Sequence, residues 1–165
     1  MILPSFWTLR GFQIGSCRNL IGLLICEHGR ATQHSLWAET AEDEESIWKK
    51  FVQKVSEYPN APIYHYGSYE ARVIESLIKR FGPASASIRK RLVNINSQVY
   101  GRVYFPVHSN SLKVLGKFLG ASWTEPDAFG LQSIVWRHRW ETGGEAQYKK
   151  SSFLTMPKTA RPCGS

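Results

Sequence analysis

The distribution of apolar residues predicts three strands in the first part of the chain. Residues 20–26 are almost continuously apolar, which is typical of a strand buried on both faces. Residues 32–38 follow across a turn at residues 27–30 and are the expected hairpin partner. Residues 63–66 form a third, short apolar stretch, and the Gly67-Ser68 pair after it indicates a tight turn into a helix.

Two helices are predicted around the third strand. Acidic residues 42–45 open the first, and Pro59 ends it; the second follows Ser68 and ends at Gly82. The apolar residues at helical spacing are Ile47, Phe51, Val52, Val55 and Tyr58 in the first helix and Val73, Ile74, Leu77, Ile78 and Phe81 in the second.

The last third of the chain predicts further helices. Ser109 or Ser111 can cap a helix that runs through Leu119, and residues 130–140 and 144–154 also have a helical pattern. Strands alternating with helices favour an α/β layer structure, and 165 residues are most simply one domain with its own core.

The charge distribution gives only mild support for a nucleic-acid partner. The net charge is +8, but all 13 acidic residues lie between Glu27 and Glu145, whereas the two ends carry four basic residues and no acid. Without these four, 17 basic residues face 13 acidic ones, a net charge of +4. The middle of the chain is therefore only mildly basic.

No apolar run approaches the roughly 18 residues that span a bilayer, so we expect no membrane association and, by default, a cytoplasmic location. The three cysteines, Cys17, Cys26 and Cys163, match neither a paired disulfide framework nor a zinc-binding spacing. We therefore expect them to be reduced thiols.

One stretch carries a family resemblance, Ile63-Tyr64-His65-Tyr66-Gly67-Ser68-Tyr69-Glu70. It resembles the second acidic motif of the ribonuclease-H-like domain in RecB-family-like nucleases, the YprB-type domain. The likeness continues through residues 109–115 and 118–120. It implies a single ribonuclease-H-like domain over residues 1–165, family-like over about 20–154, with atypical ends at 1–18 and 155–165. The implied architecture is a mixed sheet flanked by helices.

The same resemblance implies an exonuclease-like activity, the 3'-5' hydrolysis of phosphodiesters in DNA or RNA, with Mg²⁺ or Mn²⁺. Nucleases of this type hold two cations with an Asp-x-Glu on the first strand, an acid after a later strand and an Asp on the last helix. Divalent cations require hard oxygen ligands, so several carboxylates must converge.

Two residues of the motif are candidates for the chemistry. Glu70 stands at the family's second metal-ligand position, although a Glu in the first helical turn is also stabilised by the helix dipole, by about 0.3–1 kcal/mol. His65 is a candidate general base, and the alternative is a hydrogen-bonded histidine of the strand.

Aromatic and basic residues are candidates for contacts with nucleic acid. Tyr66 and Tyr69 could stack on bases, although packing is the commoner role of aromatics beside a turn. Phosphates could be held by Arg89, Lys90, Arg91 and Arg102, although such runs are usually solvated faces.

The first acidic motif of the family, typically Asp-Ile-Glu-Gly after a hydrophobic residue, is missing, because no carboxylate precedes Glu27. With synonymous codons chosen for the purpose, the DNA of residues 6–15 reads Leu-Asp-Ile-Glu-Gly-Phe-Pro-Asp-Arg from its third base. Residues 156–164 likewise read Ala-Glu-Asp-Cys-Ala-Ala-Leu-Trp, close to the family's last motif. We hypothesise that the reading frame is shifted at both ends, with transitions near Leu20 and Thr155.

On this hypothesis the fold is incomplete at its first strand and last helix, and catalysis is impaired because two of three acidic motifs are lost. Two alternatives stay open: a non-catalytic nucleic-acid-binding module, and a fragment without function of its own. The sequence leaves open whether the substrate is DNA or RNA, the polarity of degradation and the oligomeric state.

Overall fold

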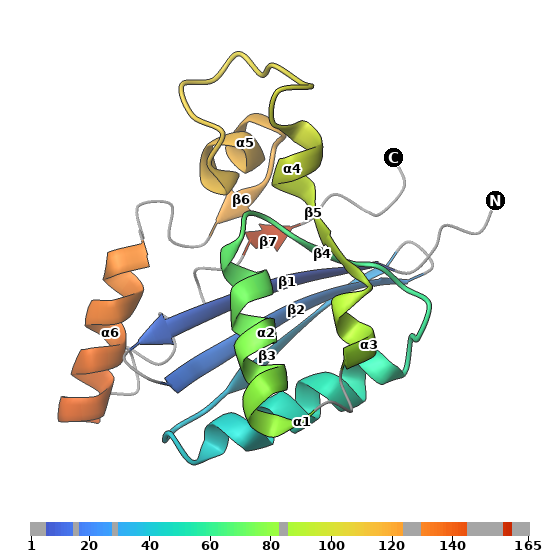
Figure 1. Cartoon of the computed structure of the whole chain (residues 1–165). Helices are drawn as coiled ribbons and strands as arrows, with labels where there is room; N and C mark the ends of the chain where they lie inside the picture. The colour runs from blue at the N-terminus through green and yellow to red at the C-terminus, as the bar shows by residue number, and fades with distance from the viewer. Residues whose placement is uncertain are drawn as a thin grey trace.

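A mixed sheet forms the centre of the protein. The computed structural model describes residues 6–14, 17–27, 30–82, 86–123, 130–144 and 157–159. Within them, five strands lie in the order β3-β2-β1-β4-β5 (Figure 1). Their bounds are β1 Phe6–Ile14, β2 Cys17–Glu27, β3 Arg30–Trp37, β4 Ile63–His65 and β5 Leu92–Asn94.

Strand direction changes at the middle of this sheet. The first three strands form an antiparallel meander, whereas β1, β4 and β5 run parallel. Parallel neighbours need crossover connections, and helices make them: α1 (Asp43–Ser56) lies between β3 and β4, and α2 (Tyr69–Phe81) and α3 (Ala86–Arg89) lie between β4 and β5. The carboxyl ends of β4 and β5 therefore meet at one edge of the sheet.

The main core lies between the sheet and the helices α1 and α2, which cover one face (Figure 1). Alternate residues of β2 point into it, and successive apolar turns of both helices pack on them. The central members are Ile21, Leu23 and Ile25 of β2, Ile47, Phe51 and Val55 of α1, and Ile74, Leu77 and Ile78 of α2.

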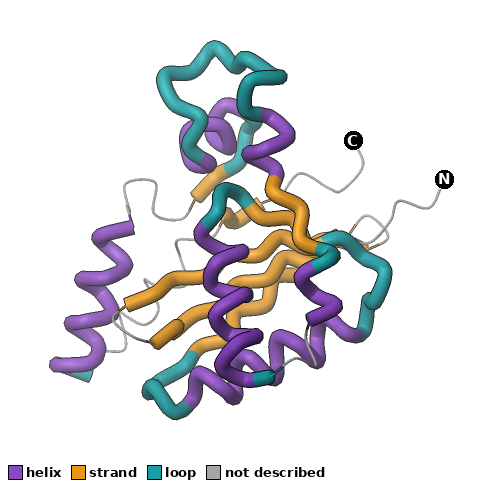
Figure 2. Tube along the Cα trace, in the orientation of Figure 1, coloured by secondary structure: helices purple, strands orange, loops and turns teal. Residues whose placement is uncertain are grey.

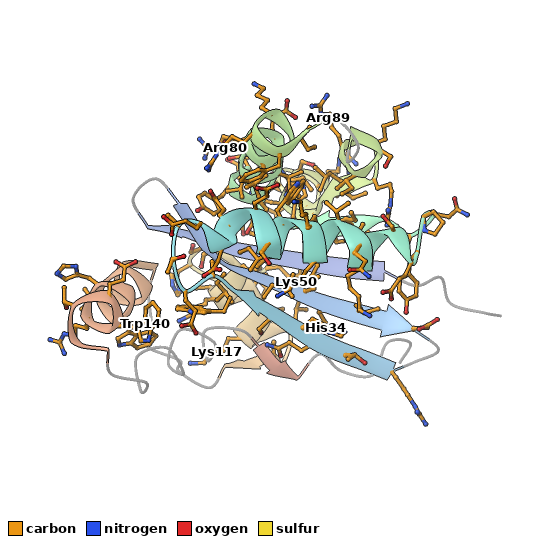
Figure 3. The ribbon with its side chains drawn as sticks, turned by 90° about the horizontal axis from the view of Figure 1, so that it is seen from below. His34, Lys50, Arg80, Arg89, Lys117 and Trp140 are labelled. Atoms are coloured by element: carbon orange, nitrogen blue, oxygen red, sulfur yellow. The ribbon has the colours of Figure 1, made fainter. Side chains whose placement is uncertain are left out.

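The opposite face of β2 is buried as well. Leu20 is 1% exposed and Cys26 is 2% exposed, as expected for a continuously apolar strand. Beside the carboxyl ends of β1 and β3 lies α6 (Gly130–Gly143) (Figure 1). The ring of Trp140 in α6 packs edge-on against Trp37 of β3, with ring centroids 5.6 Å apart (Figure 3).

A small lobe projects beyond the carboxyl ends of β4 and β5. It comprises α4 (Ile95–Val99), a loop and α5 (Leu112–Phe118), and the loop forms its apex (Figure 2). Below it, β6 (Ser122–Trp123) pairs with β7 (Pro157–Thr159) in an antiparallel ribbon.

The predicted strands and helices are confirmed over the described residues, since β2, β3, β4, α1, α2, α5 and α6 overlap the predicted segments. The prediction of an incomplete first strand was wrong. Residues 6–14 form β1, the central strand, because sheet pairing uses backbone groups that any non-proline residue supplies. The helix predicted over residues 144–154 lies outside the described residues beyond Gly144.

The expectation of reduced thiols was wrong for Cys26, which is disulfide-bonded. The number and spacing of cysteines carry no information on which of them the fold brings together. No helix in the described part of the chain combines the length and apolar character that crossing a bilayer requires.

Candidate functional site

Polar groups gather where β4 and β5 end. Gly67 follows β4 with a φ of 90°, a left-handed conformation that glycine adopts without a Cβ penalty. Its amide donates to the side-chain oxygen of Asn94 at 3.1 Å. The same Asn94 oxygen accepts from the amide of Asn96 at 3.0 Å and so caps α4. Asn94 thus ties the two strand ends together.

His65 stabilises the turn from within the sheet. It is 4% exposed, and its Nδ1 lies 2.8 Å from the carbonyl oxygen of Gly67. Burial lowers its pKa, and the bond to the carbonyl only partly opposes this. The neutral ring donates its Nδ1 proton to the carbonyl. This is the geometry of a hydrogen-bonded strand histidine, and the role of general base stays a prediction.

Glu70 lies in the first turn of α2, next to the core. Its Oε2 atom is buried, and the residue lines a cavity of about 20 Å³ together with Ile21, Trp48 and Phe51. The surroundings of this carboxylate are thus largely apolar. Desolvation disfavours a charged carboxylate in such a place unless partners compensate it.

The residues described here do not fit a two-metal centre. Strand β1, which would carry the Asp-x-Glu pair, contains no acidic residue. Within the described residues, no group of three or more His, Cys, Asp or Glu side chains is arranged to hold a metal ion. One carboxylate at this edge cannot balance two divalent cations.

Tyr66 and Tyr69, the two tyrosines predicted to stack on bases, both make contacts within the protein. The hydroxyl of Tyr66 donates to the carbonyl of Asn110, in the loop before α5. Burial raises the pKa of Tyr66, so its hydroxyl keeps the proton it donates. Tyr69 is partly buried against the main core. Tyr66 therefore connects the β4–α2 turn to the projecting lobe.

Two of the predicted basic residues, Arg89 and Lys90, are exposed. Figure 3 shows Arg89 on the α2 and α3 side of the molecule. Arg89 forms an ion pair with Glu75, with Nε 2.8 Å from Oε2, and Lys90 beside it is exposed. Arg89 also lines an open groove of about 580 Å³ with Arg72 and Lys79 of α2.

The other two predicted basic residues lie elsewhere. Arg91 points into the molecule and donates to three carbonyl oxygens around the end of α1. Arg102 is exposed on the lobe, where Nη1 donates to Gln98 at 3.2 Å. The structure therefore does not bring the four basic residues together.

Asn94 is a residue of the candidate site that the sequence interpretation missed. It stands directly before the short helix α4, and an asparagine in that place is a typical capping signal.

A family model described as the RNase H superfamily matches residues 12–154. No curated protein and no solved structure matches the chain. The matched region contains most of the sheet, both core helices and the lobe. The chain belongs to the RNase H superfamily.

Proposed function

We propose that this protein is a nucleic-acid-binding member of the superfamily, derived from YprB-type metal-dependent nucleases, in which phosphodiester hydrolysis is lost or strongly reduced. Family membership and the motif from Ile63 to Glu70 support the link to nucleases that act on DNA or RNA. An exonuclease-like, 3'-5' mode of action belongs to the ancestral enzyme in this proposal.

The observation that carries the proposal is the composition of the central strand. Trp7 and Thr8 of β1 pair with Ile63 and Tyr64 of β4, so β1 lies beside the strand that leads to Glu70. This is where the Asp-x-Glu of the family belongs, and β1 has no carboxylate. Two cations bring four positive charges, which the single carboxylate Glu70 leaves largely uncompensated.

The shifted-frame hypothesis gives this composition a cause. The alternative frame of residues 6–15 places its Asp-Ile-Glu-Gly within the stretch that forms β1. The second such stretch, residues 156–164, lies outside the described residues apart from β7. Sequencing the coding DNA tests the hypothesis directly, and alternative frames that encode neither motif would refute it.

Binding without hydrolysis requires only contacts to phosphates and bases. The groove lined by Arg72, Lys79 and Arg89 offers basic groups to phosphates, with Glu75 as the opposing charge. Such contacts are electrostatic, so they weaken steeply with salt and need no divalent ion.

The proposal is tested by assaying hydrolysis and binding on the same labelled DNA and RNA strands. The control is a variant repaired at both ends, in which residues 6–15 and residues 156–164 are replaced by their alternative-frame sequences. We expect salt-sensitive binding in EDTA and, with Mg²⁺ or Mn²⁺, hydrolysis far below that of a variant repaired at both ends. Metal-dependent hydrolysis by the unmodified chain at a similar rate would contradict the proposal.

A chain that neither binds nor unfolds cooperatively would instead fit a fragment without function of its own. Thermal unfolding measured alongside the binding assay separates this outcome from a folded protein that binds another class of partner.

A further inference from the structure

The projecting lobe, residues 95–119, presents aromatic side chains to solvent. Tyr104 is 90% exposed and Tyr100 is 71% exposed, and Phe118 is 49% exposed on α5. Exposed apolar surface that is contiguous marks interaction sites, so these aromatic side chains are candidates for contact with a partner. Both tyrosines flank Arg102, which is exposed as well.

We propose that Tyr100 and Tyr104 form a stacking platform for the bases of an unpaired nucleic-acid strand, with Arg102 contacting its backbone. This inference rests on the nucleic-acid-binding function proposed above and assigns it a surface separate from the motif around Glu70. Stacking on an aromatic ring accepts any base, because every base has a π face.

Charge favours a nucleic-acid strand as the occupant. Residues 76–124 contain eight Lys or Arg residues and no Asp or Glu. The lobe lies within this stretch and therefore contains no acidic residue. No carboxylate of the lobe can pair with Arg102 in place of a phosphate, and none can repel a phosphate near Lys117. Aromatic rings interleaved with basic groups are the combination by which proteins hold single strands.

The platform is fixed rather than left on a free loop. The amides of Arg102 and Val103 both donate to the carbonyl of Val99 at 3.0 Å, which continues α4 into a turn that contains Tyr100 and directly precedes Tyr104. Gly101 has a φ of 73° at that turn. On the other side of the loop, Phe105 packs edge-on against Phe118, with ring centroids 5.9 Å apart. A preformed platform loses less entropy when a strand binds.

The lobe is also connected to the edge of the sheet that carries the motif. Asn94 caps α4 and accepts from the amide of Gly67, and Tyr66 donates to the carbonyl of Asn110. The lobe rises from the ends of β4 and β5 (Figure 1). Bonds at Asn94 and Asn110 thus link the lobe at two points to the β4–α2 turn.

The test is fluorescence anisotropy in EDTA with labelled single strands of about 15 nucleotides, DNA and RNA in separate arms, a duplex and an abasic strand. The variants are Tyr104→Ala, Tyr100→Ala and Tyr104→Phe, which keeps the ring. Arg102→Gln is compared with Lys49→Gln, a matched loss of an exposed charge on α1. Because these side chains are exposed, each variant should keep the thermal stability of the unmodified protein.

We expect each tyrosine-to-alanine change to weaken single-strand binding by about 5- to 100-fold, with Tyr104→Phe close to the unmodified protein. The abasic strand should bind weakly and show no response to Tyr104→Ala. Arg102→Gln should reduce the slope of the logarithm of the binding constant against the logarithm of the salt concentration by about one unit, as expected for the loss of one phosphate contact. Lys49→Gln should leave this slope unchanged.

Tyrosine variants that bind single strands as tightly as the unmodified protein would overturn the platform and leave the proposed function standing. Equal losses for Tyr104→Ala and Tyr104→Phe, or equal effects on duplex and single strand, would also overturn it. Absence of any nucleic-acid binding by the unmodified protein would refute the proposed function and the platform together.

Discussion

Arg91 is a structural residue of the junction between α1 and β4, and its removal should destabilise the protein. Its Nε donates to Ala61 at 2.8 Å, Nη1 to Val55 at 3.2 Å and Nη2 to Tyr58 at 2.7 Å, each time to the carbonyl oxygen. The last carbonyls of a helix have no partner within the helix. One planar guanidinium therefore binds the end of α1 and the chain leading to β4.

The size of the effect follows from these three bonds. A hydrogen bond from a charged donor contributes about 1.5–3 kcal/mol, but Arg91 is only half-buried, so water can replace part of each bond in Arg91→Ala. We expect the free energy of unfolding to fall by about 2–4 kcal/mol, which lowers Tm by roughly 5–15 °C for a chain of this size. Burial lowers the pKa of Arg91, yet an arginine keeps its charge at any ordinary pH.

Urea unfolding followed by circular dichroism measures this loss. The control is Lys90→Ala, a neighbouring exposed cation, which should change the free energy of unfolding by less than about 0.5 kcal/mol. Arg91→Lys should recover only part of the loss, because an ammonium group cannot reach three carbonyls in a fixed fork. An Arg91→Ala protein as stable as Lys90→Ala would refute the role given to the three bonds.

Three further changes probe the helix pair and the β4–α2 turn. Arg80→Ala removes an ion pair with Glu44, whose side chain is only 1% exposed. We expect the free energy of unfolding in urea to fall by roughly 1–3 kcal/mol, less than for a fully buried pair because the side chain of Arg80 is 46% exposed. An equal loss of stability in Lys79→Ala would contradict this. Gly67→Ala should cost about 1–2 kcal/mol because of its φ of 90°, whereas Ser68→Ala, which removes no capping bond, should be nearly neutral in the same assay. The pKa of His65 is lower in the folded protein, so the unfolded chain takes up a proton more readily, and the stability that His65 contributes above about pH 6.5 is lost as the pH falls through the folded pKa. When the free energy of unfolding is measured over a pH series, it should fall less steeply for His65→Gln than for the unmodified protein. Parallel curves for the two proteins would count against a buried neutral ring.

Sequence patterns predicted the elements whose signals are local. Strand β2 is apolar along its length, and α2 repeats its apolar residues at helical spacing, so each pattern identifies both the element and its buried face. Partners distant in sequence were not predictable in this way. Arg91 was interpreted as a phosphate contact because its neighbours are basic, and only the fold places it against α1.

In the candidate site, too, local features were predictable from the sequence and partners distant in sequence were not. The motif from Ile63 to Glu70 identified the turn, and the structure adds Asn94, 27 residues after Gly67, as the group that holds it. The exposed tyrosines of the lobe carry no signal in the sequence, because Tyr100 and Tyr104 are as suitable for a core as for a surface. Exposure depends on what the rest of the chain covers.

Strand β1 explains how the chain forms a complete central strand without the first acidic motif that the resemblance implies. A central strand needs amide and carbonyl groups for its neighbours, and the sequence Phe-Trp-Thr-Leu-Arg-Gly-Phe-Gln-Ile supplies them without a proline. It is also rich in aromatic and β-branched residues, which suit a strand. A metal centre, by contrast, depends on particular carboxylates at particular positions. Replacing the side chains of β1 can therefore keep the sheet order while removing the ligands, so restoring Asp-Ile-Glu-Gly in β1 should change metal binding far more than it changes the fold.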